Sequence, residues 1–248
     1  MIWLASFPRS GNTFFRNILF EVYGIKSSAY HKDEKRTLNK QYASFELVKT
    51  HLLPAHLPAE FQNKKSVYII RDGRDCLVSI AHHRKDITEK GSPFYNNLLE
   101  AILAAEGSYF GGWSENVKQW TEKADIVIRF EDLIKNPIKE VEKLRSIFDL
   151  PNPDISKLPN FKVLKFGKPK YGGNTALKHF RKGKIGGWKD DLPPELHRLF
   201  WDLNSKEMLE NNFTDTVLPI RANWKTNLNY LNLKKQSLIL RFGRKFGL

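Results

Sequence analysis

Apolar residues follow two different periodicities along the chain. Short apolar runs bounded by polar turns predict buried strands. Four such runs are found at residues 1–7, 45–51, 65–72 and 124–130. The first run is followed by apolar residues at helical spacing, among them Phe14, Ile18 and Val22. Strands that alternate with helices predict an α/β fold, with a parallel sheet flanked by helices on both faces.

Helical spacing returns further along the chain. The helices that it predicts cover residues 74–85, two segments of 93–123 that separate near 110–113, residues 136–150, and residues 192–209. Residues 27–42 are polar and predict an irregular segment. No repeat, linker or low-complexity block is present. We therefore predict one domain, residues 1–212, with residues 213–248 as its basic C-terminal extension.

The turn after the first strand is a candidate anion site. It reads "SFPRSGNTFF", residues 6–15, with one Gly, one cation and several hydroxyl or amide side chains. A tight loop that leads into a helix presents free backbone N–H groups at the positive end of the helix dipole. The alternative is an ordinary turn whose Ser and Thr only cap the helix. This stretch alone does not decide between the two.

Composition narrows the choice of partners. Lys and Arg exceed Asp and Glu by 41 − 27 = 14, which predicts an anionic partner. The single cysteine, Cys76, excludes an internal disulfide and a cysteine-based metal site. No apolar run reaches the roughly 20 residues of a membrane span, and the first apolar segment is too short for a signal peptide. We therefore expect a cytoplasmic protein.

Cations gather in the loops that follow the predicted strands. Ligands of parallel sheets bind at the carboxyl ends of the strands, where these loops meet. The cations are Arg9, Lys49, Arg71 and Arg74. His51 and several hydroxyl side chains accompany them. This convergence is harder to explain by helix capping than any single loop.

These loops resemble the motifs of the PAPS-dependent sulfotransferases of the cytosolic type that acts on aryl and alcohol acceptors. Four motifs match in the order of that family. They are "SFPRSGNTFF", "VKTHLLP" from Val48, "VYIIRDGRDCLVS" from Val67 and "FRKGKIGGWKDDL" from Phe180. Two weaker matches are "GGWSENVKQW" and "IRFEDLIKNP". The resemblance covers about residues 1–212, and we expect a bacterial member of the family.

The resemblance implies a P-loop-like core that binds PAPS, an adenosine nucleotide with a 5′-phosphosulfate and a 3′-phosphate. A sulfuryl group passes in line to an acceptor hydroxyl or amine, without a metal, and PAP is the product. His51 is the expected general base, Arg9 faces the leaving group, and Lys49 either assists the transfer or is a surface charge. The expected nucleotide-binding residues are Arg9, Ser10, Gly11, Asn12, Thr13, Phe14, Arg71, Ser79, Phe130, Phe161, Arg181, Lys182 and Gly183.

These residues divide by the part of the nucleotide that they are expected to bind. The loop amides of residues 10–13 and the hydroxyls of Ser10 and Thr13 serve the 5′-phosphate. The 3′-phosphate is expected to bind Arg71, Ser79, Arg181, Lys182 and Gly183. The adenine is expected to stack on Phe14. Contacts of the adenine with Phe130 and Phe161 are less certain, because both side chains can equally belong to the hydrophobic core.

The chain departs from the family pattern at several positions. Arg9 replaces the usual Lys, Phe14 a Trp, Phe130 a Tyr, and Gly187 an Asp. An Arg gives bidentate contacts and does not deprotonate, so it suits a phosphosulfate but not a role that needs a mobile point charge. Two prolines, Pro193 and Pro194, interrupt the family's dimer motif, and the oligomeric state stays open.

Two other classes compete with this prediction. A P-loop kinase shares the fold and the loop, but Gly11 is followed by Asn12 where a kinase carries the phosphate-binding Lys. A nucleic-acid-binding module would also explain the charge. Its cations are expected along one helix or on an aromatic surface rather than in post-strand loops. We therefore expect no nucleic-acid partner.

The C-terminal segment carries half of the charge excess. Beyond Asp215 there are seven basic residues and no acidic one. Leu228, Leu231, Leu238, Ile239 and other apolar residues share one helical face. A terminal helix docked on the domain and a helix at the inner membrane surface are both compatible with this pattern. The acceptor is a small molecule, a glycan or a lipid-linked molecule, with residues 27–42 and 84–112 expected to line its site.

Overall fold

The computed structural model describes most of the chain in two compact units. The described residues are 1–31, 41–104, 110–167, 169–172, 183–213 and 224–246. One unit consists of residues 1–71 and 116–185, and the other of residues 72–115 and 186–248. Because each unit joins two distant stretches of chain, chain order alone does not reveal this division.

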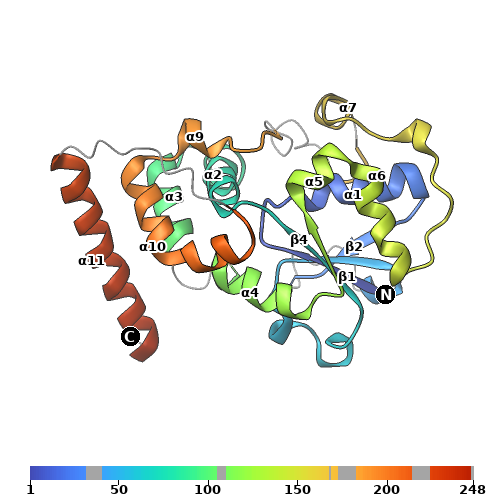
Figure 1. Ribbon diagram of the computed structural model, residues 1–248, viewed down its shortest axis with the longest axis horizontal. Helices are drawn as coiled ribbons and strands as arrows, with labels where there is room; N and C mark the ends of the chain where they lie inside the picture. The colour runs from blue at the N-terminus through green and yellow to red at the C-terminus, as the bar shows by residue number, and fades with distance from the viewer. Residues whose placement is uncertain (32–40, 105–109, 168, 173–182, 214–223, 247–248) are drawn as a thin grey trace. The chain divides into compact units, whose positions relative to one another are not determined.

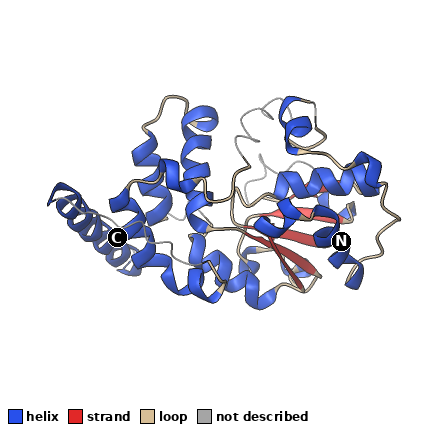
Figure 2. Cartoon of the chain, turned by 45° about the horizontal axis from the view of Figure 1, so that its top comes forward, coloured by secondary structure: helices blue, strands red, loops and turns tan. Residues whose placement is uncertain are grey.

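The first unit contains a parallel five-stranded sheet in the order β2-β3-β1-β4-β5 (Figure 2). The strands are β1 (Ile2–Ser6), β2 (Ser27–Ala29), β3 (Leu47–Thr50), β4 (Ser66–Ile70) and β5 (Ile126–Arg129). Four of them confirm the prediction, and β1 lies at the centre. The prediction of an irregular segment at residues 27–42 is wrong for β2. This strand, Ser-Ser-Ala, has no apolar alternation and is held by main-chain pairing with β3.

One face of this sheet is covered by α1, α5 and α6 (Figure 1). The helices of the first unit are α1 (Asn12–Tyr23), the larger part of α4 (Trp113–Lys123), α5 (Phe130–Lys135), α6 (Pro137–Glu142) and α7 (Phe161–Phe166). Strand residues such as Leu4 and Ile69 meet Phe15 and Ile18 of α1 there. On the other face, Tyr68 of β4 stacks on a buried tryptophan of α4 at 6.1 Å between ring centroids. The predicted parallel sheet with helices on both faces is thus confirmed.

The helix predicted at residues 136–150 is shorter in the structure. It ends as α6 at Glu142, and a 3-10 turn follows at residues 143–146. Asn136 has φ −137° and ψ 67°, outside the helical region, because Pro137 hinders a helical conformation in the residue before it. This residue therefore separates α6 from the short helix α5.

The second unit is helical. Its helices are α2 (Gly73–His83), α3 (Phe94–Leu103), α9 (Trp188–Asp191), α10 (Pro194–Glu210) and α11 (Trp224–Phe246), with a π-turn at residues 84–88. The positions of α2, α3, α4 and α10 confirm the predicted helices. Within the described residues, no helix is both long enough and apolar enough to cross a bilayer.

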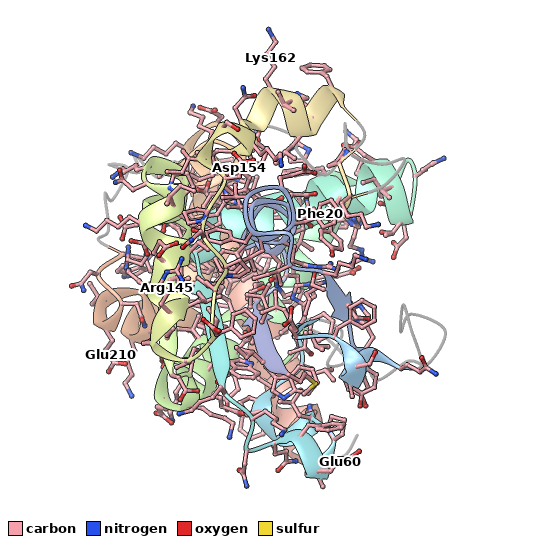
Figure 3. All side chains as sticks on the ribbon, turned by 90° about the vertical axis from the view of Figure 1, so that its right-hand side faces the viewer. Phe20, Glu60, Arg145, Asp154, Lys162 and Glu210 are labelled. Carbon is pink, nitrogen blue, oxygen red and sulfur yellow. The ribbon has the colours of Figure 1, made fainter. Side chains whose placement is uncertain are left out.

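Tyr171 ties the segment 169–172 to α1 in the first unit. The amide of Asn17 donates to the carbonyl of Tyr171 at 2.9 Å, and the Tyr171 N–H donates back to the Asn17 Oδ1 at 3.0 Å. The Tyr171 ring meets Phe20 edge-on, with 6.2 Å between centroids. Figure 3 labels Phe20 on α1. A buried side chain that pairs both polar groups of a distant backbone holds that backbone firmly against the helix.

Candidate active site

The loop between β1 and α1 has backbone geometry suited to an anion. Arg9 and Gly11 have positive φ values of 69° and 102°. Gly11 is the N-cap residue of α1 and makes no side-chain cap hydrogen bond, which contradicts the alternative that Ser or Thr merely caps this helix. Successive residues of opposite handedness turn their N–H groups toward one side, at the positive end of the helix.

Phe130 and Arg71 hold this loop from one side. The Arg71 guanidinium lies 4.2 Å from the centroid of the Phe130 ring, and its Nη1 donates to the carbonyl of Arg9 at 3.0 Å. Its Nη2 donates to the carbonyl of Lys184 at 3.2 Å. The Phe130 ring packs so closely against Gly11 that a Cβ there would lie 2.8 Å from Cε2 and still closer to Cδ2. Only glycine fits this position.

His51 is oriented by the carbonyl at the end of β1. Its Nδ1 lies 2.7 Å from the carbonyl oxygen of Ser6. A carbonyl only accepts hydrogen bonds, so the proton of the neutral imidazole sits on Nδ1 and Nε2 keeps its lone pair. Burial lowers the pKa of His51 well below its usual value, and the Lys49 charge lowers it further.

Asn12 contacts the side chain of the same residue, Ser6. Its Nδ2 donates to the Ser6 hydroxyl at 2.6 Å, and that oxygen lies 3.4 Å from the His51 Nδ1. The Asn12 Oδ1 is buried with no hydrogen-bond partner among the described residues. Asn12 therefore links the first turn of α1 to the strand end that orients His51.

The charges of Lys49 and Arg9 act on His51, and the charge of Arg16 acts on Lys49. Lys49 is half-buried in β3, and burial together with the charges of Arg16 and Arg9 lowers its pKa to about 7. Arg16 is buried on α1, where its Nε donates to the Ser27 hydroxyl at 2.7 Å. Desolvation lowers the pKa of Arg16 to about 10. Burial of these positive charges, with repulsion between them at Lys49, favours binding of an anion that would neutralise them.

His31 faces His51 in the structure. The two ring centroids are 6.4 Å apart, with an angle of 54° between the planes. His31 follows β2, and β3 lies between β2 and β1 in the sheet, so both histidines stand at the carboxyl ends of parallel strands. The sequence analysis assigned His31 no role, because β2 itself was missed.

The other residues expected to bind the nucleotide differ in burial, and some of them lie outside the described part of the chain. Ser10 is buried and Thr13 half-buried at the start of α1, whereas Phe14 is 6% exposed within the core. Gly183 is described and has φ 59°. Arg181 and Lys182 lie outside the described residues. Phe161 begins α7, and its side chain is likewise outside them.

Ser79 and Arg74 belong to the second unit, on α2. Ser79 is half-buried. Arg74 is buried, its Nη2 bonds the Asp72 carboxylate at 2.8 Å, and its guanidinium lies 4.1 Å from the centroid of the Trp188 ring. Arg74 therefore takes part in an ion pair and a cation–π contact inside the second unit.

Asp75 organises the segment that contains the last motif. Its two carboxylate oxygens accept from the N–H groups of Gly186 and Trp188, both at 2.9 Å. The Trp188 ring stacks on His197 with 4.9 Å between centroids. The motifs that begin at Val67 and Phe180 thus meet, although more than a hundred residues separate them. Nothing in the spacing indicates this contact.

A metal centre finds no support in the described part of the chain. No group of three or more His, Cys, Asp or Glu side chains lies close enough there to hold an ion. The residues present fit a phosphorylated ligand instead. The loop with positive φ at Arg9 and Gly11 leads into the first turn of α1, whose backbone N–H groups attract negative charge, and Arg9 and Lys49 add positive charge nearby.

Comparisons with known proteins bear on the family and the fold of this chain. A sulfotransferase domain model matches residues 22–212. The chain is 26% identical to mouse sulfotransferase 1E1 over 243 residues, which is 83% of this chain and 82% of that protein. Among solved structures, mouse sulfotransferase SULT7A1 complexed with PAP superimposes with a TM-score of 0.67 at 20% identity, over 86% of this chain and 85% of that one.

Retinol dehydratase in complex with androsterone and inactive cofactor PAP shares the fold at a TM-score of 0.60 and 19% identity, over 89% of this chain and 82% of that one. The family model covers well over half of the chain, and it decides between the three functional classes that the sequence left in competition. The chain belongs to the sulfotransferase domain family, and it is a PAPS-dependent enzyme.

Proposed function

We propose that His51 is the general base of this sulfotransferase and removes the proton of an acceptor hydroxyl or amine. The observation that carries the proposal is the 2.7 Å contact of Nδ1 with the Ser6 carbonyl. It places the imidazole proton on Nδ1, so that Nε2 is the basic nitrogen, and the lowered pKa of His51 keeps the ring neutral at pH 7. A base must be unprotonated before it can act.

We further propose how the chain holds its donor. When bound, PAPS supplies the sulfuryl group and PAP is its leaving group. The amides of residues 10–13 and the hydroxyls of Ser10 and Thr13 bind the 5′-phosphate, with Arg9 and Lys49 beside the transferred group. The other residues that we assign to the donor are Arg71, Ser79, Arg181, Lys182 and Gly183 at the 3′-phosphate, and Phe14, Phe130 and Phe161 at the adenine.

The acceptor side is the least specified part of the proposal. His31 stands 6.4 Å from His51 by ring centroids, and this supports a polar acceptor that meets both imidazoles. We propose a hydroxyl on a small molecule, a glycan or a lipid-linked carrier. We also propose a cytoplasmic location, with the C-terminal helix as a peripheral contact to the inner membrane surface.

The test replaces His51 by asparagine, whose side-chain amide can still donate to the Ser6 carbonyl but cannot accept the acceptor proton. Turnover of PAPS is expected to fall about 10²- to 10⁴-fold. The rise in melting temperature on adding PAP should stay as in the unchanged enzyme. His56→Asn is the matched control, because His56 is exposed and only five residues away.

Two results would refute the role of His51. One is turnover that survives His51→Asn within tenfold. The other is a parallel loss of turnover and of the PAP-induced melting shift, which would make His51 a structural residue.

A further inference from the structure

The C-terminal helix α11 is attached to its unit by one face only. Tyr230, Leu233 and Ser237 are buried along that face. The Tyr230 hydroxyl donates to the Asp202 carboxylate of α10, and the Arg198 guanidinium lies 4.1 Å from the centroid of the Tyr230 ring. The ammonium of Lys234 reaches the same Asp202 at 3.2 Å. Polar and cation–π contacts therefore fasten this helix, together with a small apolar area.

The opposite face of α11 carries large apolar side chains in solvent. At about 100° per residue they fall within an arc of about 100°, centred roughly opposite Ser237. We call this set the outer stripe of α11. Its members are 50% to 70% exposed, and they are Trp224, Leu228, Leu231, Leu238, Ile239 and Phe242. Scattered single apolar residues are normal on a surface, but a continuous stripe of six on one helix indicates a binding surface.

The charge around the outer stripe selects the kind of partner. Lys235 lies within the stripe and Lys225 at its border, and both are exposed. From residue 216 to the end of the chain there are seven Lys or Arg residues and no Asp or Glu. An apolar stripe on a helix whose charged residues are all cations matches the interface of an anionic bilayer, where apolar side chains enter the acyl region and ammonium groups meet the phosphates. A protein partner would need negatively charged side chains along the whole length of α11 to match these cations.

We propose that the outer stripe binds the surface of a membrane that contains anionic lipid, with α11 lying in the plane of the interface. The inference goes beyond sulfuryl transfer. It gives the enzyme a second binding surface, on the C-terminal helix, and it requires no span of the bilayer. The expected consequence is access to acceptors that reside in or on the membrane.

The test is co-sedimentation of the full-length protein with vesicles. One set contains phosphatidylglycerol and phosphatidylcholine, and the other phosphatidylcholine alone. We expect binding to the anionic set only, weakened by added salt. Leu231→Glu should reduce the binding about tenfold, because it replaces a lipid-facing apolar side chain by a charge that anionic lipid repels. Leu209→Glu is the matched control, since Leu209 on α10 is 57% exposed and Leu231 is 59%.

A second measurement needs no variant. Trp3, Trp113, Trp120 and Trp188 are buried and Trp201 is half-buried, whereas Trp224 is 70% exposed. A blue shift of the tryptophan emission on adding anionic vesicles therefore reports Trp224, and Trp224→Phe should abolish it.

Three results would overturn the proposal. The first is no sedimentation with anionic vesicles at low salt and no blue shift. The second is equal binding by wild-type protein and Leu231→Glu. The third is a lipid-free dimer that Leu231→Glu converts to a monomer, which would assign the outer stripe to a second copy of the chain. The PAP-induced melting shift, measured on the same samples, reports the sulfotransferase site separately.

Discussion

Gly11→Ala is the change that tests the geometry of the β1–α1 loop most directly. Gly11 has φ 102°, which an L side chain rarely adopts, and a Cβ added there would lie 2.8 Å from the Cε2 of Phe130. The new methyl group therefore meets both a strained backbone and a buried ring. Phe130 is 3% exposed and sits beneath the Arg71 guanidinium, so its ring has little room to move.

The magnitude follows from these two effects. The backbone conformation costs an alanine about 1–2 kcal/mol, and forcing the methyl group against Phe130 adds about 1–3 kcal/mol. The free energy of unfolding should fall by about 2–5 kcal/mol. In a chain of this size that lowers the melting temperature by about 4–20 °C. Gly24→Ala is the control, because Gly24 also has a positive φ, 70°, but its Cβ would meet nothing within 4 Å. Its loss should be about 1–2 kcal/mol.

The assay is thermal unfolding followed by circular dichroism, with and without PAP. Gly11→Ala should melt below Gly24→Ala and lose most of the PAP-induced rise. Adding Phe130→Leu should return part of the lost stability, so that the double variant is less destabilised than the sum of the singles. Equal melting temperatures for Gly11→Ala and Gly24→Ala would show that Phe130 does not confine this loop.

Two further predictions concern charges. The pH profile of kcat/KM should keep its acid limb below pH 6.5, since the pKa of His51 is lowered. It should fall again as pH rises through about 7, where Lys49 loses its positive charge. Lys49→Arg should remove the alkaline fall, and a wild-type profile that stays flat to pH 9 would contradict the role of Lys49. Asp75→Ala should lower the free energy of unfolding by about 1–3 kcal/mol for each of the two amides left unbonded. This loss is measured by urea titration against Asp149→Ala, an exposed aspartate; equal losses for both would contradict it.

The central strands and the β1–α1 loop were predictable because their signals are local. β1 and β4 are buried on both faces and read as short apolar runs, and the loop between Ser6 and Asn12 carries its own Gly and hydroxyl residues. His51 was predictable from its motif. The atom that orients His51 was not predictable. It is the backbone carbonyl of Ser6, 45 residues away, and a pattern of side chains gives no information about a backbone contact.

The edge strand β2 and the buried cation Arg16 escape sequence patterns for a different reason. β2 consists of two serines and an alanine, so nothing in its composition favours a strand over a loop. Its burial depends on pairing with β3 and on the Arg16 side chain that bonds Ser27. Arg16 is a charged residue beside apolar residues of α1, and such a residue is buried only when another segment supplies its hydrogen bonds. His31 follows β2 and was missed with it.

For the C-terminal helix α11, the usual rule for amphipathic helices predicts the wrong buried face. An amphipathic helix normally buries its apolar stripe against the protein. In α11 the outer stripe faces solvent. Tyr230, Leu233 and Ser237 are buried on the docked side, where Tyr230 contacts Asp202 and Arg198. Docking α11 by its outer stripe would remove more apolar area from water than docking it by the observed face. The side chains of the outer stripe therefore do not act in the contact with α10. A helix that keeps six large apolar residues exposed while its other side is docked on α10 has a surface for a second partner. The absence of Asp and Glu from residue 216 to the end of the chain favours the anionic bilayer that we propose as this partner.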